Sequence, residues 1–218
     1  MQERPTRLLR HMLIAISLVI AYSTANSTPT RITVETTSLF GVSGHLAFDL
    51  IDGGSPSNQV VISNFSSNGS LGTSSSSGSV TGDFASTVVL ADLAFFSEYL
   101  QAFTFGTFLS FDYEDTNNSP GLTSFPDAFS LFLLDSTASA SLVATSDPTA
   151  SNSLLLKGIG SGQPFDIYTS LSVTTSIEPV LGVPEPSSLV LAALALFALP
   201  WHHRNFVAAP NTFDARQI

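Results

Sequence analysis

The chain has 218 residues, which is enough for one domain of ordinary size once its two ends are set aside. Its formal net charge is −10, and residues 26–183 contain 14 carboxylates but only two basic side chains, Arg31 and Lys157. Such a surface repels phosphates, which excludes nucleic-acid binding, and the lack of cysteine excludes disulfides, thiol nucleophiles and cysteine-ligated zinc.

The N-terminal 25 residues have the three parts of a secretory signal peptide. Three arginines precede the apolar run Leu13–Ala21, and small residues at Ser23 and Ala25 fit a cleavage site after Ala25. The run is shorter than the roughly 20 residues of a membrane span. We therefore predict a signal helix at residues 1–25, cleaved after Ala25 on export through the secretion translocon. An uncleaved N-terminal anchor is the alternative.

Residues 26–182 have the pattern of an exported all-β domain. Apolar and polar residues alternate most clearly in Phe103–Tyr113, as expected of one half-buried strand. Further β-branched or apolar runs predict strands at Thr30–Ser38, His45–Ile51, Gln59–Phe65, Ala128–Leu134, Leu154–Lys157 and Asp166–Ser176. Stretches such as "DGGSPSN" and "EDTNNSPG" separate the runs with turn-forming residues. The pattern predicts a jelly-roll-like antiparallel β-sandwich.

Two segments do not fit the strand pattern. Val89–Phe103 has apolar residues at helical spacing, which allows a short helix or a bent loop between Leu93 and Leu100. Ser66–Asp83 is a Ser/Gly-rich low-complexity stretch with little apolar surface to bury. We predict that residues 66–83 form a mobile loop within the domain.

The exported segment lacks an obvious catalytic constellation. No Gly-x-Ser-x-Gly nucleophile elbow is present, the nearest sequence being the Gly/Ser turn around Ser43. His45 is the single histidine between residues 26 and 183, and one histidine among scattered serines does not make a triad. We therefore predict no catalytic residues and no enzymatic activity.

Four carboxylates form a weak candidate for a calcium site. Asp112, Glu114 and Asp115 cluster where the strongest predicted strand ends, and Asp127 follows after a Pro/Gly-rich loop. Several loop oxygens gathered at one end of a sandwich suit Ca²⁺, a hard cation. A solvated acidic turn is the favoured alternative, and a pair of glycosidase carboxylates is a third. Apart from calcium, no cofactor is expected.

The chain closes with a second targeting-like segment. Val183, Pro184, Glu185 and Pro186 precede the apolar block Ser187–Trp201, and His202, His203 and Arg204 follow that block. As a helix the 15-residue block reaches about 22 Å, against about 30 Å of bilayer hydrocarbon. Its polar flank would remain inside as a stop-transfer cluster. We predict an apolar membrane helix within residues 183–204, followed by a tail at 205–218.

This arrangement resembles the PEP-CTERM sorting signal of exported bacterial proteins. The resemblance covers Val183–Arg204, and the chain differs from the family pattern in having one arginine in its basic cluster and in continuing to Ile218. It implies an inner-membrane-tethered precursor and an exosortase, a membrane protease/transpeptidase that cuts near the Pro-Glu-Pro triplet. The resemblance also implies that the processed protein passes to the cell surface or the extracellular matrix.

The exported core also resembles known sequences. Gly82–Tyr113 and Phe125–Asp135 are similar to a subgroup of PEP-CTERM proteins with sandwich-like exported domains. We therefore expect a non-enzymatic surface or matrix protein with an exosortase, and exopolysaccharide, as partners. The alternative is a carbohydrate-binding or calcium-stabilised adhesive module, in which exposed Tyr99, Tyr113 or Phe108 would stack on sugars.

Overall fold

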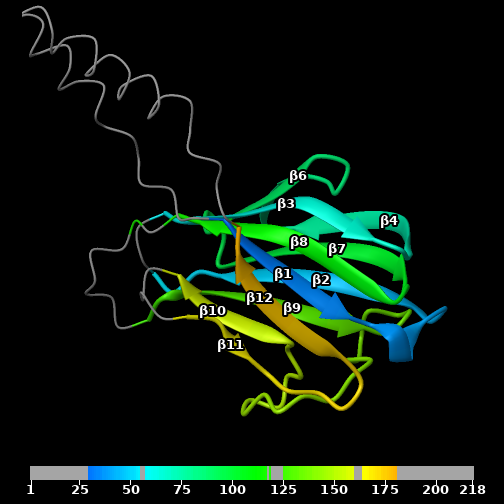
Figure 1. Ribbon diagram of the computed structural model, residues 1–218. Coiled ribbons are helices and arrows are strands. Elements are labelled where there is room, and N and C mark those ends of the chain that lie inside the picture. Colours follow the sequence, from blue (N-terminus) through cyan, green and yellow to red (C-terminus); the bar gives the residue numbers. More distant parts are fainter. Residues whose placement is uncertain (1–28, 55–56, 117, 119–124, 160–163, 181–218) are drawn as a thin grey trace, which may run out of the picture. The chain divides into compact units, whose positions relative to one another are not determined.

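The computed structural model describes residues 29–54, 57–116, 118, 125–159 and 164–180, and these form two six-stranded antiparallel sheets (Figure 1). Sheet A has the order β12 (Thr174–Pro179), β1 (Thr30–Glu35), β8 (Phe108–Asp115), β3 (Gln59–Ser67), β6 (Thr87–Ala91) and β5 (Ser79–Gly82). Sheet B has the order β11 (Asp166–Ile167), β10 (Leu155–Ile159), β9 (Asp127–Leu134), β2 (Ser43–Ile51), β7 (Phe96–Thr104) and β4 (Ser70–Ser77). A short 3₁₀ helix, η1, spans Thr37–Leu39.

The predicted all-β antiparallel sandwich is confirmed. The predicted signal helix and C-terminal apolar helix lie outside the described residues. In the ranges that the structure describes, no helix has the length and apolar character needed to span a bilayer.

The two sheets pack through aromatic and branched apolar side chains. Alternation along β2 turns Leu46, Phe48 and Leu50 into the interior, where each is fully buried. The Phe48 ring packs edge-on against Phe111 of the opposite sheet, with centroids 5.2 Å apart, and lies 6.4 Å from Phe129. Period-two patterning therefore builds one shared core from both sheets.

Most of the predicted strands are confirmed with small changes of boundary. Thr30–Ser38, His45–Ile51, Gln59–Phe65, Ala128–Leu134 and Leu154–Lys157 correspond to β1, β2, β3, β9 and β10. The predicted strand Asp166–Ser176 is largely wrong. Only the two residues of β11 and the first three of β12 fall in it, and the residues between them form turns and one isolated bridge.

The predicted single strand Phe103–Tyr113 is also wrong, because it contains a crossing between the sheets. β7 ends at Thr104 in sheet B, and β8 begins at Phe108 in sheet A. A Cβ atom on Gly106 would lie 2.1 Å from Asn68 Oδ1 and 2.6 Å from Gly69 N. Glycine is therefore required at the crossing, where Asn68 Oδ1 accepts a 2.8 Å hydrogen bond from the Thr107 amide.

No helix forms between Leu93 and Leu100. Residues 93–95 make a turn, and β7 runs from Phe96 with Ser97, Tyr99, Gln101 and Phe103 on its buried face. Two of these four residues are polar, which hid the period-two pattern. Ser97 Oγ donates to Ala91 O (2.8 Å) and Gln101 Nε2 to Gly72 O (2.8 Å), so both polar side chains are satisfied when buried.

The prediction of a mobile loop at residues 66–83 is wrong as well. The segment contains the end of β3, all of β4 and all of β5. β4 pairs with β7 at one edge of sheet B, and β5 pairs with β6 at one edge of sheet A. All eight residues of β4 are exposed, so backbone hydrogen bonds and not side-chain burial place this strand.

Both ends of the sandwich lie at the same pole. The Val180 amide donates a 2.8 Å hydrogen bond to Pro29 O, and Thr30 pairs with both Pro179 and Tyr113. β3 begins between the last residues of β8 and those of β6, since Val60 pairs with Asp115 and Gln59 pairs with Ala91. We call this end, marked by Pro29, Val180 and the turns after β2, β6 and β8, the terminal pole.

Candidate metal centre

The structure does not bring the four predicted calcium ligands together. Asp112 forms a salt bridge with Arg31 of β1 and accepts a 2.8 Å hydrogen bond from Asn64 Nδ2. Asp115 accepts from the Tyr113 hydroxyl (3.1 Å), and Glu114 pairs in register with Val61. The hydrogen bond from Arg31 holds the pKa of Asp112 below its usual value, as expected of an ion-paired carboxylate.

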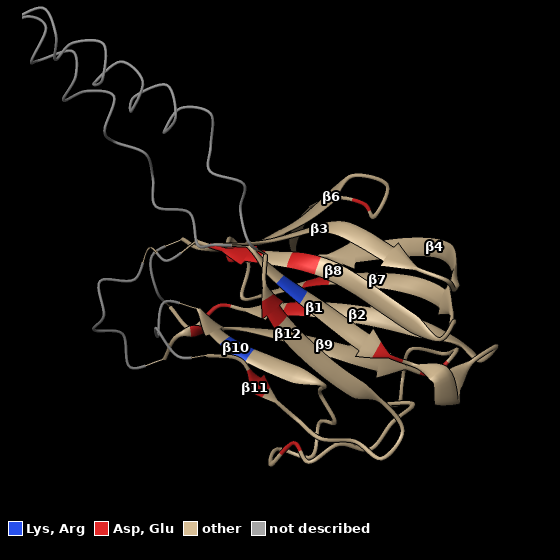
Figure 2. Cartoon of the chain, in the orientation of Figure 1, with Lys and Arg blue, Asp and Glu red and all other residues tan. Residues whose placement is uncertain are grey.

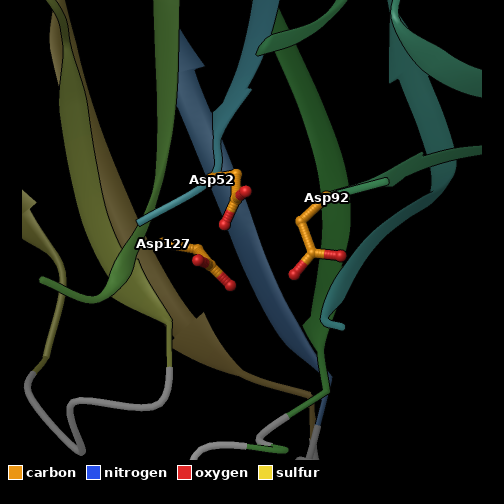
Figure 3. A group of neighbouring side chains, drawn as sticks. All are labelled: Asp52, Asp92 and Asp127. Atoms are coloured by element: carbon orange, nitrogen blue, oxygen red, sulfur yellow. The ribbon is translucent and has the colours of Figure 1, made fainter. Parts of the chain in front are cut away.

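Asp127 instead meets two carboxylates that sequence analysis did not select. Asp52 follows β2, Asp92 follows β6 and Asp127 begins β9. One oxygen from each lies within 4.8 Å of the others, and this is the one such acidic group of three or more in the part of the chain that the structure describes. Figure 3 shows the three carboxylates converging on a common space from separate strands.

A glycine turn positions two of the three carboxylates. The Gly54 amide donates to Asp52 Oδ1 (2.6 Å), and the Gly53 amide donates to Asp127 Oδ1 (2.8 Å). Gly54 has a φ of +84°, and a Cβ atom on Gly53 would lie 2.4 Å from Phe125 O. Two consecutive glycines are needed for this tight approach, which explains the "DGG" sequence after β2.

Asn58 joins the other side of the cluster. Its backbone amide donates to Asp92 Oδ2 (2.6 Å), and its side-chain Nδ2 donates to Asp127 Oδ2 (2.7 Å). The amide of Asn118, beyond β8, donates to Asn58 Oδ1 at 2.9 Å. One buried asparagine therefore connects turns of sheet A to the first residue of β9 in sheet B.

The electrostatics of the cluster are unfavourable for three bare anions. Asp127 is fully buried and Asp92 is 7% exposed, whereas Asp52 is only partly buried. Burial raises the pKa of Asp92, and the charges of Asp127 and Asp52 add to this rise, although the hydrogen bond from Asn58 opposes it. Asp92 Oδ1 is buried and has no hydrogen-bond partner.

Two further acidic side chains lie next to each other on the outer face of sheet B. Asp49 of β2 pairs in register with Glu98 of β7, and both line a cavity of about 430 Å³ beneath the chain between β9 and β10. Burial, together with the negative charge of Glu98, raises the pKa of Asp49 to about 7. Asp49 Oδ1 is buried without a hydrogen-bond partner, so this carboxylate titrates in a protected site.

The predicted sugar-stacking aromatics are not exposed as expected. Tyr99 is 2% and Tyr113 3% exposed, and Phe108 is half-buried in β8. Tyr113 nevertheless lines a cavity of about 440 Å³ with Asp115, Lys157 and Phe165. The Tyr113 and Phe165 rings lie 4.9 Å apart edge to face, and Lys157 Nζ lies 5.5 Å from the Phe165 centroid.

Arg31 on β1 and Lys157 on β10 are the arginine and lysine side chains of the described sandwich (Figure 2).

The predicted sorting residues and the cleavage site at Ala25 lie outside the described residues. A family model described as the PEP-CTERM protein-sorting motif matches residues 182–204, about a tenth of the chain, and this match includes Val183–Pro186 and His202–Arg204. No curated protein and no solved structure matches the chain. The motif marks an exported protein with a membrane-anchored precursor that an exosortase processes. The C-terminal segment of this chain therefore matches the PEP-CTERM protein-sorting motif, and the described residues before it form a β-sandwich.

Proposed function

We propose that the protein is a non-enzymatic component of the cell surface or extracellular matrix, delivered there after exosortase cleaves its C-terminal segment. The observation that carries this proposal is the sorting-motif match at residues 182–204, directly after a sandwich that ends at β12. A sorting signal at residues 182–204 does not depend on a catalytic site in the sandwich.

The chemistry of the motif suits a protease that works at the membrane surface. Pro184 and Pro186 have no backbone N–H, and proline disfavours helical backbone at the residue before it. Glu185 is the one formally charged residue between Glu178 and Arg204. The triplet is therefore a singly charged, helix-disfavouring sequence next to an apolar block; in this proposal the block retains the precursor and the triplet is recognised.

The double substitution Pro184→Ala with Glu185→Ala tests this proposal in the native host. A simple membrane anchor needs only apolar length and flanking charge, so it would not respond to the change. We expect the variant to accumulate as a longer, membrane-retained species, measured by intact-mass spectrometry. Ser187→Ala with Ser188→Ala is the matched control and should be processed normally. A wild type and a variant that both retain Trp201, with masses that differ only by the two substitutions, would leave an anchor and no processing signal.

Carbohydrate binding is a second candidate function, favoured by the cavity that Tyr113, Asp115, Lys157 and Phe165 line. An aromatic ring beside carboxylate and ammonium groups offers both stacking and hydrogen bonding to a sugar. Exopolysaccharide purified from the host should bind the wild-type protein in a sedimentation assay. Phe165→Ala should weaken binding at least tenfold, whereas Phe40→Ala, at an exposed position after η1, should not. Equal binding by both variants would reject this cavity as the sugar site.

A further inference from the structure

We propose that Asp52, Asp92 and Asp127 form a calcium site that joins the two sheets at the terminal pole. The proposal is independent of sorting, because it concerns the folded sandwich and not the C-terminal segment.

The spacing of the carboxylates fits a single ion. Calcium–oxygen distances are about 2.3–2.6 Å, so two oxygens bound to the same Ca²⁺ lie at most about 5 Å apart. One oxygen from each of the three aspartates lies within 4.8 Å of the other two. The amides of Gly53 and Asn58 fix the orientation of the Asp127 and Asp92 carboxylates before any ion arrives. A carboxylate oxygen that accepts one hydrogen bond keeps a second lone pair for the metal.

A second observation points to a bound cation. Asp92 is more than nine-tenths buried, its carboxylate faces the other two in Figure 3, and its Oδ1 has no hydrogen-bond partner. Leaving a buried anionic oxygen without a partner is expensive. A divalent cation would give that oxygen a ligand bond and would also neutralise two of the three neighbouring charges.

The donor set favours calcium among the common divalent ions. All three side chains are carboxylates, which are hard oxygen donors, whereas zinc and copper favour histidine or cysteine ligands. The ligands come from three irregular turns and strand ends, which suits the flexible coordination of Ca²⁺ better than the strict octahedron of Mg²⁺. Asp52 is only partly buried, which leaves an open side for water ligands.

The ion would act as a cross-link between layers. Asp92 extends from β6 in sheet A, while Asp52 and Asp127 flank β2 and β9 in sheet B. Asn58 already connects the same turns by hydrogen bonds. Calcium would therefore stabilise the packing of the two sheets where the chain enters and leaves the sandwich.

Thermal unfolding of the full-length protein in detergent, with EDTA or with added Ca²⁺, tests the site. A hundredfold excess of Ca²⁺ over its Kd should raise Tm by roughly 5 °C or more, since a ligand of the folded state stabilises it by mass action. Mg²⁺ at the same concentration should raise Tm less. In Asp92→Asn, Tm in EDTA should rise because like charges no longer repel, while the response to Ca²⁺ should disappear. A purely structural carboxylate would not give this pair of opposite effects.

The control variant is Asp83→Asn, which removes one exposed carboxylate before β6, at the far end of that strand from Asp92. It should keep the full response to Ca²⁺. Asp127→Asn is the second ligand variant. If it does not fold, Asp52→Asn replaces it, because Asp52 is less buried. Identical melting of the wild type in EDTA and in Ca²⁺ would overturn the proposal, as would a full Ca²⁺ response in Asp92→Asn. Equal stabilisation by Mg²⁺ and Ca²⁺ would overturn the assignment to calcium.

Discussion

Arg31 on β1 and Asp112 on β8 form a salt bridge between strands that are direct neighbours in sheet A. Arg31 Nε donates to Asp112 Oδ1, and Nη2 donates to Oδ2 at 2.9 Å. The Asp112 side chain is 4% exposed and that of Arg31 is 42% exposed. The guanidinium therefore covers a carboxylate that would otherwise be buried without a counter-charge.

Replacing Arg31 by Met should lower the free energy of unfolding near neutral pH by about 1–3 kcal/mol, less than for a fully buried pair because Arg31 is partly solvated. The free energy of unfolding of Arg31→Lys should lie between those of the wild type and Arg31→Met, because lysine keeps the positive charge but cannot form the bidentate contact. Urea unfolding measures both.

The loss of stability in Arg31→Met should depend on pH in a defined direction. The pKa of Asp112 is depressed in the folded protein, so its contribution to stability is present above the unfolded value of about 3.9 and is lost as the pH falls through the folded value. The gap between the wild type and Arg31→Met should therefore narrow in acid. A gap that stays constant down to about pH 2 would contradict this account.

The contribution of Asp49 to stability should depend on pH in the opposite direction to that of Asp112. The pKa of Asp49 is raised to about 7, so between about pH 4 and pH 7 the folded state binds more protons than the unfolded state and stability falls as the pH rises. Asp49→Asn should be more stable than the wild type above pH 7, by an amount on the order of 1–3 kcal/mol, and nearly equal to it at about pH 4. Asp166→Asn, at an exposed position of β11, is the control variant. Urea unfolding at several pH values makes the comparison.

Gly106→Ala should destabilise the crossing between β7 and β8. The added methyl group would clash with Asn68 Oδ1 and with the Gly69 backbone, and the expected loss is about 1–3 kcal/mol in urea unfolding. Gly41→Ala provides the comparison, because Gly41 has open space around its Cβ position and only an unfavourable φ of +77°. An equal or larger loss at Gly41 would show that steric contact at the crossing is unimportant.

Gln101→Leu should also destabilise the sandwich, by about 1–3 kcal/mol. The Gln101 side chain accepts from the Tyr99 hydroxyl (3.0 Å) and donates to Gly72 O, so it ties β7 to the edge strand β4. Gln59→Leu, at an exposed position that starts β3, is the control. Hydrogen exchange of the β4 amides should accelerate in Gln101→Leu but not in Gln59→Leu. Unchanged protection of these amides in Gln101→Leu would argue against a link between β7 and β4 through Gln101.

Strands were predictable where most of the buried positions carry apolar side chains, whereas β7 alternates in burial but was missed because two of its buried residues are polar. β2 and β9 carry apolar runs, and their positions follow from the sequence. β4 was not predictable, because all its side chains are exposed and its place depends on backbone pairing with β7 and on the Gln101 side chain. The change of sheet at Gly106 was hidden because apolar alternation continues through the crossing.

The candidate metal centre was only partly predictable. Asp127 was selected from its place after a Pro/Gly-rich loop, but Asp52 and Asp92 stand alone in the sequence, and successive members of the group are 40 and 35 positions apart. The "DGG" turn was recognisable as a turn, yet its approach to Asp127 depends on β2 and β9 being neighbours. Strand order is a long-range property, and local pattern does not determine it.

The shared position of the two sandwich ends has a mechanical consequence. While a precursor is held by its C-terminal segment, any pull on the domain enters at Val180 and runs along β12. β12 pairs with β1 over six residues, from Thr30 with Pro179 to Glu35 with Thr174. A load along the strand axis shears these pairs together, whereas a load across the strand would open them one at a time. The domain should therefore resist drag from flow or from attached polymer better when pulled through Val180 than through a linkage on the face of β12.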